Sequence, residues 1–425
     1  MKKFWSIFYN VIFLPTLCLI LQIFGLINQK VKKGIEGRKR VFEELIVEMK
    51  QLKPRKKNIW FHSASLGEFE QAKPIIEKLK AEQNVNIIIT FFSPSGYENS
   101  RKYPYADLIS YLPFDTKSNA DKFVRIVKPD LAIMMRYDIW PNVIYKLKEL
   151  NYPVFIVDAT MRKDSLRTLP FMKSFHKALY SNFSGFLTVS QSDAEGFKLF
   201  NCDDEKIKVV GDTRFDRVLQ KSMQARDKRL INKTVIENKK VFVAGSTWEQ
   251  DEEVILPAFV KLAKFDKNVM LIIAPHEPTL LHLEKIENEF AGILKTIRFS
   301  HLNNYSDERV IIVDSIGILL TLYTYADVAF IGGSFKQNVH NVLEAAVYGI
   351  PVMFGPKIEN SQEARQLHKR GGGLMIYGKR EAYRRLRTLF NDKELRERKG
   401  KISFEYVHEN TGATEKIIKE IKKVI

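Results

Sequence analysis

Short apolar segments alternate with helical stretches along most of this chain, and this alternation constrains the fold more than any other feature. The stretches between the apolar segments repeat apolar residues at helical spacing, as in residues 71–80, where Ile75, Ile76 and Leu79 share one face. Strands that alternate with helices predict a parallel sheet with helices on both faces. The predicted strands are residues 58–62, 86–90, 108–111, 131–134, 154–157 and 185–188, then 240–244, 269–274, 309–313, 327–331 and 351–354.

A polar, charged region at residues 219–239 interrupts the alternation and is interpreted as an interdomain link. The chain has 425 residues, and about 100–200 residues per domain is usual, so two domains are expected. The sequence therefore predicts an α/β fold with two Rossmann-like domains and an N-terminal membrane-anchor helix. The expected boundaries are 1–30 for the anchor, 31–225 and 226–400 for the two domains, and 401–425 for a C-terminal helix.

The N-terminal segment, residues 4–27, contains no charged side chain. As a helix it would be about 36 Å long at about 1.5 Å per residue, which exceeds the bilayer core of about 30 Å. Lys2 and Lys3 precede the segment, and a heavier basic cluster follows it at residues 30–40. Basic residues favour the cytoplasmic side of a membrane, so the large part of the chain is expected in the cytoplasm.

This segment has two other interpretations. It is longer than a typical signal-peptide core and no small-residue cleavage site follows it, which argues against a cleaved signal. Pro15 would kink a helix near its middle, and Trp5, Tyr9, Asn10 and Gln22 suit a membrane interface. The segment therefore either spans the bilayer or lies in its plane, and both arrangements hold the protein at a membrane surface.

The composition indicates anionic partners and a reducing compartment. The chain has 68 basic and 50 acidic residues, a formal net charge of +18, which favours nucleic acid, anionic lipid or phosphorylated substrates as partners. No helix-turn-helix, zinc or RNP-type motif supports nucleic acid, so no nucleic-acid partner is expected. Cys18 and Cys202 lie in unrelated settings and predict neither a disulfide framework nor a metal site.

The densest motif lies at residues 331–364. A predicted strand leads into the sequence GGS, a helix is expected to begin near Asn341 with Glu344 in its first turn, and the next strand ends in GP. Glycines let the backbone approach a ligand closely, and a helix N-terminus offers free N–H groups to an anion. An acid in the first turn can also accept hydrogen bonds from ribose hydroxyls. The unit predicts a site for a nucleotide-linked donor at the carboxyl edge of a parallel sheet.

Several motifs together resemble one glycosyltransferase family. Residues 60–68, WFHSASLGE, and the GGS, HN, LE and GP motifs of residues 331–356 are similar to the 3-deoxy-D-manno-octulosonic acid (Kdo) transferases, which build the inner core of lipopolysaccharide. DIWPN at residues 138–142 and GSTWEQDEE at residues 245–253 extend the resemblance. It implies the GT-B fold, in which the last helix crosses back to the first domain. Residues 401–425 are long enough to do so.

The SLGE motif carries the expected catalytic base. Ser65, Gly67 and Glu68 follow the first predicted strand and open a helix, so they point to the edge where open α/β sheets bind ligands. The helix dipole would keep Glu68 ionised, as a general base requires, although an acid in this position is often only a cap partner. The resemblance implies that Glu68 deprotonates the acceptor hydroxyl, and that Ser65 and Gly67 belong to the loop that contacts the acceptor and Kdo.

Two further residues of the first domain are candidates through the resemblance. Arg214, in GDTRFD, would stabilise the charge that develops as the nucleotide phosphate leaves. The alternative is a surface arginine paired with Asp212 or Asp216. Asp138 keeps one acid of the family's motif before WPN, whereas the two residues before it depart from the family pattern.

The donor nucleotide is assigned by the resemblance to the second domain. The family usually has Pro-Arg where this chain has Pro275-His276, so the charge of this contact would depend on pH. No cofactor is expected, and no metal, because His340 has no second ligand-type residue at ligand spacing. The donor-binding residues expected are Pro275, His276, Ile316, Gly317, Ile318, Gly333, Ser334, Asn341, Val342, Leu343 and Glu344.

The resemblance implies an inverting transferase that moves Kdo from CMP-Kdo to a lipid A precursor of the lipid IVA type. The expected location is the cytoplasmic face of the bacterial inner membrane. Two alternatives are a nucleotide-sugar epimerase with the same folding pattern and a basic scaffold that only binds anionic lipid. The apolar segment argues against a soluble epimerase, and the ordered donor-site motif argues against a scaffold.

Overall fold

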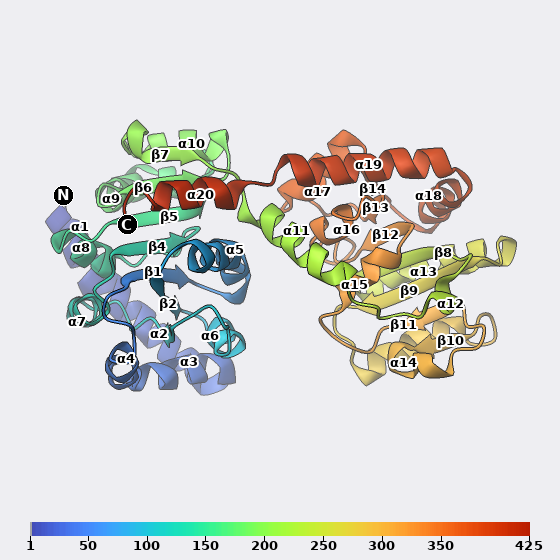
Figure 1. Cartoon of the computed structure of the whole chain (residues 1–425), viewed down its shortest axis with the longest axis horizontal. Coiled ribbons are helices and arrows are strands. Elements are labelled where there is room, and N and C mark those ends of the chain that lie inside the picture. The colour runs from blue at the N-terminus through green and yellow to red at the C-terminus, as the bar shows by residue number, and fades with distance from the viewer. Residues whose placement is uncertain (1) are drawn as a thin grey trace. The chain divides into compact units, whose positions relative to one another are not determined.

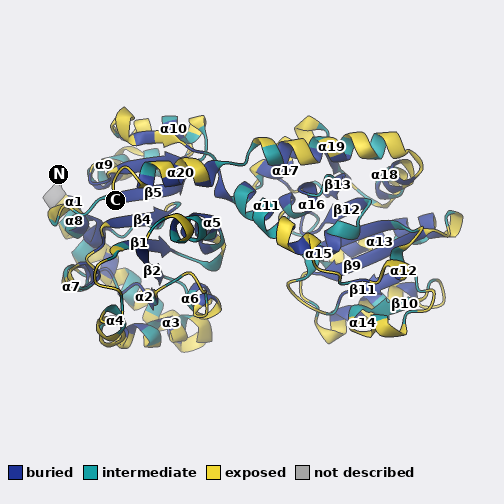
Figure 2. Cartoon of the chain, in the orientation of Figure 1, coloured by how far each residue is buried: buried dark blue, intermediate teal, exposed yellow. Residues whose placement is uncertain are grey.

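The structure, a computed structural model, describes residues 2–425 (Figure 1). It divides into two compact units: unit 1 comprises Met1–Arg217 with Thr411–Ile425, and unit 2 comprises Val218–Asn410. Each unit contains one parallel sheet of seven strands, and its strands are buried between helices (Figure 2). The prediction of an α/β fold with two Rossmann-like domains is therefore confirmed.

The sheet of unit 1 has the order β3-β2-β1-β4-β5-β6-β7. Both β2 and β4 pair with β1, so the chain moves first to one side of β1 and then to the other. The point where the order reverses lies between β1 and β4, and ligands bind at such switch points in open α/β sheets. The strands are β1 (Lys57–Ser63), β2 (Val85–Phe91), β3 (Leu108–Tyr111), β4 (Leu131–Met135), β5 (Val154–Ala159), β6 (Gly185–Thr188) and β7 (Ile207–Val209).

Helices cover both faces of this sheet because its strands are apolar on both faces. Trp60 of β1 packs into the core with α7, α8, α9 and α10, whereas its neighbours Ile59 and Phe61 pack with α5 and α20 on the opposite face. The helices of unit 1 are α3 (Gln29–Lys39), α4 (Val41–Met49), α5 (Leu66–Glu82), α6 (Pro94–Ser100), α7 (Lys117–Val127), α8 (Pro141–Glu149), α9 (Pro170–Tyr180), α10 (Gln191–Lys198) and α20 (Ala413–Ile421).

The C-terminal end of the chain belongs to unit 1, where α20 packs against α5 (Figure 1). The expected single helix over residues 401–425 is broken: α19 ends at Glu409, and Gly412 has a left-handed φ of 97°. Asp216 accepts hydrogen bonds from the N–H groups of Gly412 and Thr414, each at 2.6 Å, and so fixes the start of α20.

The sheet of unit 2 has the order β10-β11-β9-β8-β12-β13-β14, with its own switch point between β8 and β12. The short edge strands β10 and β14 have too few residues to show a pattern and were not predicted from the sequence. The strands are β8 (Lys240–Thr247), β9 (Val269–Pro275), β10 (Thr296–Arg298), β11 (Val310–Ile312), β12 (Val328–Ile331), β13 (Val352–Phe354) and β14 (Gly373–Met375).

The helices of unit 2 complete its core, in which α13, α14 and α18 pack on β8 and β9. The predicted link at residues 219–239 is partly helical, since α11 (Thr213–Arg226) runs through the boundary between the units and α12 follows it. The helices are α12 (Lys233–Ile236), α13 (Glu249–Phe265), α14 (Leu280–Phe290), α15 (Leu319–Leu322), α16 (Leu343–Ala346), α17 (Gln362–Arg370), α18 (Lys379–Asn391) and α19 (Lys393–Glu409).

The N-terminal apolar segment is helical in three successive pieces: α1 (Lys2–Phe8), a π-helical turn η1 (Tyr9–Phe13) and α2 (Leu14–Ile27). The π turn ends at Phe13, two residues before Pro15, and a regular α-helical turn there would press the proline ring against the preceding turn. Residues 4–27 are long and apolar enough to cross a membrane by length and composition.

One face of this helix is docked on unit 1. The indole N–H of Trp5 donates to Ser174 at 3.2 Å, and the hydroxyl of Tyr9 donates to Asp115 at 2.9 Å. Asn10 and Asn142 exchange hydrogen bonds through their side chains, at 2.8 and 3.1 Å. Trp5 and Tyr9 are buried, whereas the opposite face exposes large apolar side chains: Phe4, Ile7, Val11, Ile12, Leu19, Ile20, Ile23, Phe24, Leu26 and Ile27.

Candidate active site

The two acids expected from the sequence of unit 1 lie on either side of its switch point. Glu68 is in the first turn of α5, which follows β1, and Asp138 is in the loop that follows β4. Because β1 and β4 are adjacent and parallel, both residues emerge at the same carboxyl edge of the sheet. The fold therefore brings together two carboxylates that are 70 positions apart in the sequence (138 − 68).

Glu68 is buried, and its Oε2 accepts the backbone N–H of Ala64 at 2.6 Å. Burial raises the pKa of Glu68; the Ala64 N–H opposes this, and the nearby charge of Asp138 adds to it. Desolvation therefore opposes the helix dipole that was expected to keep this acid ionised. A carboxylate with a raised pKa is better matched to a proton acceptor at neutral pH.

Glu68 also acts as a capping partner at the start of α5, which was the alternative interpretation of this acid. Ser65 occupies the N-cap of α5 but makes no capping bond with its side chain, and the bond from Ala64 to Glu68 closes the turn instead. Within residues 2–425, Oε1 has no hydrogen-bond donor, so half of the carboxylate remains available. Gly67 is exposed beside it, and an added Cβ there would meet only Ser65 Oγ, at 3.9 Å.

A chain of hydrogen bonds holds Asp138 in place. Trp60 Nε1 donates to Thr90 Oγ1 at 2.8 Å, Thr90 Oγ1 lies 2.8 Å from His62 Nδ1, and His62 Nε2 lies 2.8 Å from Asp138 Oδ2. An ionised carboxylate only accepts hydrogen bonds, so Nε2 carries the hydrogen when Asp138 is ionised. His62 and Thr90 are positioning residues that sequence reasoning missed. The sequence did contain a signal for them, because each is a polar side chain at the buried carboxyl end of a strand, and the two strands are neighbours.

Arg214 forms an ion pair with Asp212. Its Nε lies 3.1 and 2.9 Å from the two carboxylate oxygens, and its terminal nitrogen lies 2.5 Å from one of them. Burial works to raise the pKa of Asp212, but Arg214 outweighs it and lowers that pKa. The pairing with Asp212 matches the alternative interpretation of Arg214, and the guanidinium is about one third exposed, at 35% of its side chain.

A second buried acid lies beside this pair. Burial, with Asp212 close by, raises the pKa of Asp158 to about 7, and Asp158 accepts the N–H of Thr213 at 3.2 Å. Arg136 adopts a left-handed φ of 59°, and its charge acts on Glu68, Asp158 and Asp212. This edge of unit 1 therefore concentrates coupled titratable groups.

The GGS loop of unit 2 is arranged differently from the expectation. Asp251 accepts the N–H of Gly333 at 2.7 Å and that of Phe335 at 3.2 Å, while Ser334 Oγ accepts the N–H of Gly355 at 2.6 Å. These donors are used inside the fold and are not free for an anion. A Cβ at Gly332 would lie 2.6 Å from the Cα of Thr247, so this glycine allows two loops of the protein itself to approach closely.

The helix that was expected to begin near Asn341 is short. It is the single turn α16, Leu343–Ala346, with Glu344 in it. Asn341 accepts the N–H of Leu343 at 3.2 Å, and its amide donates to Glu344 at 3.1 Å. Val342 and Leu343 are buried in the core, so only Asn341 and Glu344 of this group reach the surface with their side chains.

An aromatic stack lies at the carboxyl edge of unit 2. The ring of His276, just after Pro275, lies 4.4 Å from that of His340 and 4.7 Å from that of Trp248, measured between centroids. Burial, with His276 close by, lowers the pKa of His340 to about 4. The ammonium of Lys336 lies 3.2 Å from the centroid of the Trp248 ring. The loop at residues 316–318 also lies at this edge, and Ile316 is 83% exposed.

Sequence relatives identify the family. Residues 39–217 match the family described as 3-Deoxy-D-manno-octulosonic-acid transferase (kdotransferase). The chain is 30% identical over 347 residues to the 3-deoxy-D-manno-octulosonic acid transferase of Aquifex aeolicus, covering 81% of this chain and 89% of that one. This chain belongs to the Kdo transferase family. It is therefore a glycosyltransferase, and the resemblance stated from its motifs is confirmed.

Two other relatives give the extent of the likeness. The 3-deoxy-D-manno-octulosonic acid transferase of Haemophilus influenzae is 28% identical over 431 residues, which cover 98% of both chains. A bifunctional glycosyltransferase/methyltransferase of Fusobacterium nucleatum is 30% identical over 345 residues, 79% of this chain but only 53% of that protein. This Kdo transferase family member thus matches about half of the bifunctional relative and nearly all of the other.

Solved structures support the fold. UDP-GlcNAc 2-epimerase from Neisseria meningitidis, bound to UDP-GlcNAc, aligns with a TM-score of 0.61 at 14% identity, covering 86% of this chain and 100% of that one. A glycosyltransferase from Rickettsia africae aligns with a TM-score of 0.54 at 12% identity, covering 87% and 99%. At these identities the likeness shows a shared two-domain α/β fold and nothing of the substrate.

Proposed function

We propose that this Kdo transferase moves Kdo from CMP-Kdo to a sugar hydroxyl of a lipid A precursor of the lipid IVA type. The observation that carries the proposal is Glu68, a buried acid with a raised pKa and one open oxygen, at the switch point of a chain that belongs to the Kdo transferase family. Its position suits a group that receives a proton during reaction.

The chemistry is a single displacement with inversion. Glu68 takes the proton of the acceptor hydroxyl, the hydroxyl oxygen forms a bond to the anomeric carbon of Kdo, and the bond from that carbon to CMP breaks. The electron pair leaves with the CMP phosphate. Arg214 would stabilise that charge, with Asp212 holding its guanidinium in place. His62 fixes Asp138, which adds negative charge near Glu68 and strengthens it as a base.

The donor nucleotide is proposed to lie at the carboxyl edge of unit 2. Glu344 would accept the ribose hydroxyls, and the loop at residues 316–318 would present its backbone to the base. The family usually has an arginine where this chain has His276, and His340 stacks on His276. Two imidazoles would therefore face the phosphate in place of one guanidinium. The two glycines of the GGS loop support this edge by tight packing rather than by touching the ligand.

The N-terminal helix is proposed to lie in the plane of the bacterial inner membrane, with both units on the cytoplasmic side. Trp5, Tyr9 and Asn10 are hydrogen-bonded to other parts of unit 1, and the remaining residues 15–27, part of which pack against α3, span only about 20 Å at about 1.5 Å per residue. That length is less than the bilayer core of about 30 Å. The exposed apolar face would instead enter the interface, as in monotopic anchors.

The test is transfer in detergent micelles with purified full-length protein, CMP-Kdo and lipid IVA. Release of CMP together with a lipid product heavier by one Kdo or more supports the proposal, and Glu68→Gln should release neither. Release of CMP without a modified lipid, or conversion of UDP-GlcNAc to its epimer by the same preparation, would defeat it.

A further inference from the structure

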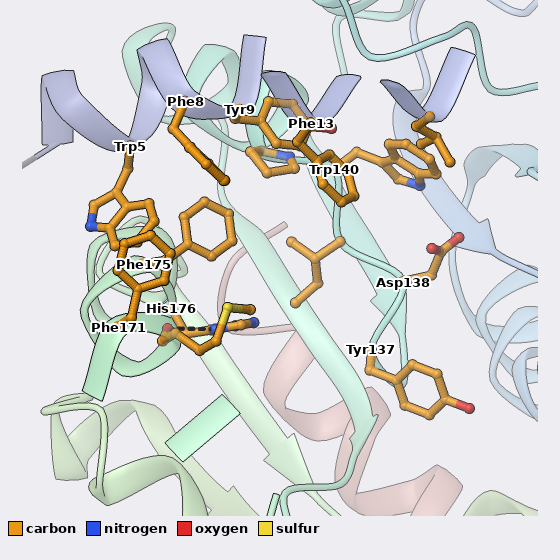
Figure 3. A pocket seen from close by; sticks show the side chains of 14 residues that line it. Trp5, Phe8, Tyr9, Phe13, Tyr137, Asp138, Trp140, Phe171, Phe175 and His176 are labelled. Carbon is orange, nitrogen blue, oxygen red and sulfur yellow. Dashed lines mark hydrogen bonds between the residues drawn. The ribbon is translucent and has the colours of Figure 1, made fainter. Parts of the chain in front are cut away.

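A cavity of ≈ 490 Å³ lies beneath the N-terminal helix in unit 1 (Figure 3). One wall is the inner face of α1 and η1, with Trp5 and Phe13; another is α9, with Phe171; and the third is the loop after β4. Leu17 of α2 closes one side. The volume lies within the range of about 300–1,000 Å³ that small-molecule sites occupy.

The interior of this cavity is mostly apolar, because three of the polar groups in its lining are engaged in hydrogen bonds with the protein. The Trp5 indole N–H donates to Ser174, the Tyr9 hydroxyl donates to Asp115, and His176 Nδ1 lies 2.8 Å from the carbonyl of Met172. Burial lowers the pKa of His176 to about 4, so this imidazole is neutral at pH 7. Apart from Trp140 Nε1, which is buried without a hydrogen-bond partner among the described residues, and Asp138 at one end, the lining offers few polar groups to hold water and favours an apolar ligand.

One end of the cavity is polar and leads to the candidate active site. Asp138 lines this end, and the same carboxylate lies 2.8 Å from His62 Nε2 at the switch point (Figure 3). A ligand that filled the cavity with an apolar group would therefore place its attached head at the edge that carries Glu68.

A second cavity of ≈ 390 Å³ shares the residue next to Asp138. Tyr137 lines both cavities, and the second one contains Arg167 together with Arg162, which is paired with Asp164 of the same lining at 3.1 Å. The Arg167 guanidinium lies 5.6 Å from the centroid of the Tyr137 ring. Basic side chains beside an apolar cavity complement a molecule that has an apolar chain and an anionic head.

We infer that the aromatic cavity binds one acyl chain of the glycolipid acceptor and so positions the sugar head at Glu68. The inference rests on the proposed function, since it names where that acceptor's apolar part is held. The docked N-terminal helix then has two roles: its outer face contacts the membrane, and its inner face forms the roof of a lipid site. Each methylene removed from the bound chain should weaken acceptor affinity by about fourfold.

The kinetic test uses a matched pair of substitutions on one helix. Leu17→Trp fills the cavity, whereas Leu19→Trp adds the same side chain at a position that is 57% exposed and outside the cavity. Transfer is measured in micelles with an acylated acceptor and with a deacylated, phosphorylated disaccharide. Leu17→Trp should raise the KM for the acylated acceptor at least tenfold and leave the deacylated one unchanged. Leu19→Trp should change neither.

A binding test separates this inference from the proposed function. Trp5 and Trp140 line the cavity, and a brominated acyl chain quenches tryptophan on contact, so a brominated acceptor should quench the wild-type protein. Trp140→Phe should reduce the quenching; its Nε1 is buried without a partner, so phenylalanine suits the site. Brominated phospholipid vesicles without acceptor should quench less at equal lipid concentration.

The outcomes are distinct. Quenching without any transfer of Kdo would defeat the proposed function and leave the acyl site standing. Transfer of Kdo without tryptophan quenching, together with the same KM for the acylated acceptor in Leu17→Trp and Leu19→Trp, would overturn the acyl site. Equal quenching by phospholipid vesicles would overturn the assignment to the acceptor and make the cavity a site for membrane lipid.

Discussion

The two units carry an acid at equivalent positions, the third residue of the helix after their first strand. In unit 1 this is Glu68 of α5, and in unit 2 it is Asp251 of α13. Asp251 is fully buried and accepts three backbone N–H groups, from Trp248, Gly333 and Phe335. Glu68 is slightly exposed and accepts only one.

The number of hydrogen bonds explains why equivalent acids serve different purposes. A carboxylate has about four acceptor positions, and Asp251 spends three of them on holding a loop of its own unit. Burial raises the pKa of both residues, so the pKa shift alone does not separate them. The open oxygen of Glu68 does, because only a carboxylate with free acceptor capacity can receive a proton from a substrate.

The largest effect is expected from Glu68→Gln. The amide oxygen can still accept the N–H of Ala64, so the fold of α5 should survive, but the proton acceptor is lost. The rate of Kdo transfer should fall by about 10²–10⁴-fold, while CMP binding, which belongs to unit 2, should stay within twofold. Steady-state transfer and calorimetric CMP titration measure the two quantities. Wild-type turnover in this variant would reduce Glu68 to a capping residue.

The next effect is expected from Glu344→Ala, through the donor. Hydrogen bonds to a charged group contribute about 1.5–3 kcal/mol, so loss of the ribose contact should weaken CMP-Kdo binding by roughly 10–150-fold. Asn341→Ala is the matched control, because it removes the donor to Glu344 and keeps the carboxylate. A variant that melts earlier but binds CMP normally would show that Glu344 only supports its own helix.

Asp251→Asn should act on stability rather than on chemistry. The amide nitrogen replaces one acceptor oxygen, so at least one buried N–H of the GGS loop loses its partner, at a cost of about 1–3 kcal/mol. Unit 2 should melt earlier, and peptides around residues 331–336 should exchange hydrogen faster, as mass spectrometry can measure. Glu68→Gln is the control, because it makes the same change from carboxylate to amide in unit 1. Equal destabilisation by both variants would remove the contrast between the two acids.

The smallest effect expected is a change in the stability of unit 2 with pH. The pKa of His340 is lowered to about 4, so between about pH 6.5 and pH 4 the unfolded chain binds a proton there that the folded chain does not. The contribution of this residue to stability is therefore complete above pH 6.5 and is lost as the pH falls toward 4. The Tm should drop further between pH 7 and pH 5 in the wild type than in His340→Asn. Parallel losses in both proteins would contradict the assignment.

Unit 1 contains a group whose contribution to stability depends on pH in the opposite direction. Burial raises the pKa of Asp115 to about 7, although the N–H groups of Asn142 and Val143 and the Tyr9 hydroxyl work against it. Its contribution is present below about pH 4 and is lost as the pH rises through about 7. The Tyr9 hydroxyl donates to Asp115 and lowers this pKa, so that single contact of the N-terminal helix strengthens as the carboxyl ionises and runs against the net dependence.

Much of the fold follows from local sequence patterns. Apolar segments of strand length, separated by helical stretches, predicted both sheets, and the lone uncharged segment predicted the N-terminal helix. Part of the site in unit 1 follows for the same reason, because residues directly after the ends of β1 and β4 must reach one edge of the sheet. The pairing of β1 with β4, which puts Asp138 near Glu68, came only from the structure.

The donor edge shows where sequence patterns are insufficient. The glycines at 332 and 333 predicted close approach, which is correct, but the approaching atoms belong to Thr247, Asn338 and neighbouring residues of the protein. The N–H groups of Gly333 and Phe335 in this loop are bonded to Asp251, which is 82 positions from Gly333. A glycine motif shows that other atoms approach the backbone closely. It does not show whether those atoms belong to a ligand or to the protein itself.

The sequence by itself determined the two α/β units, the apolar helix, the family and the acid at the first switch point, because each depends on local patterning or on the order of strand and loop along the chain. Tertiary structure decided which of two equivalent acids keeps an open oxygen. It also decided that the apolar helix is tied to unit 1 through Asp115 and Asn142, with a cavity beneath it. Those outcomes depend on contacts between residues more than 80 positions apart, as in Tyr9 with Asp115 at a separation of 106, and such contacts leave no periodic signal in the chain.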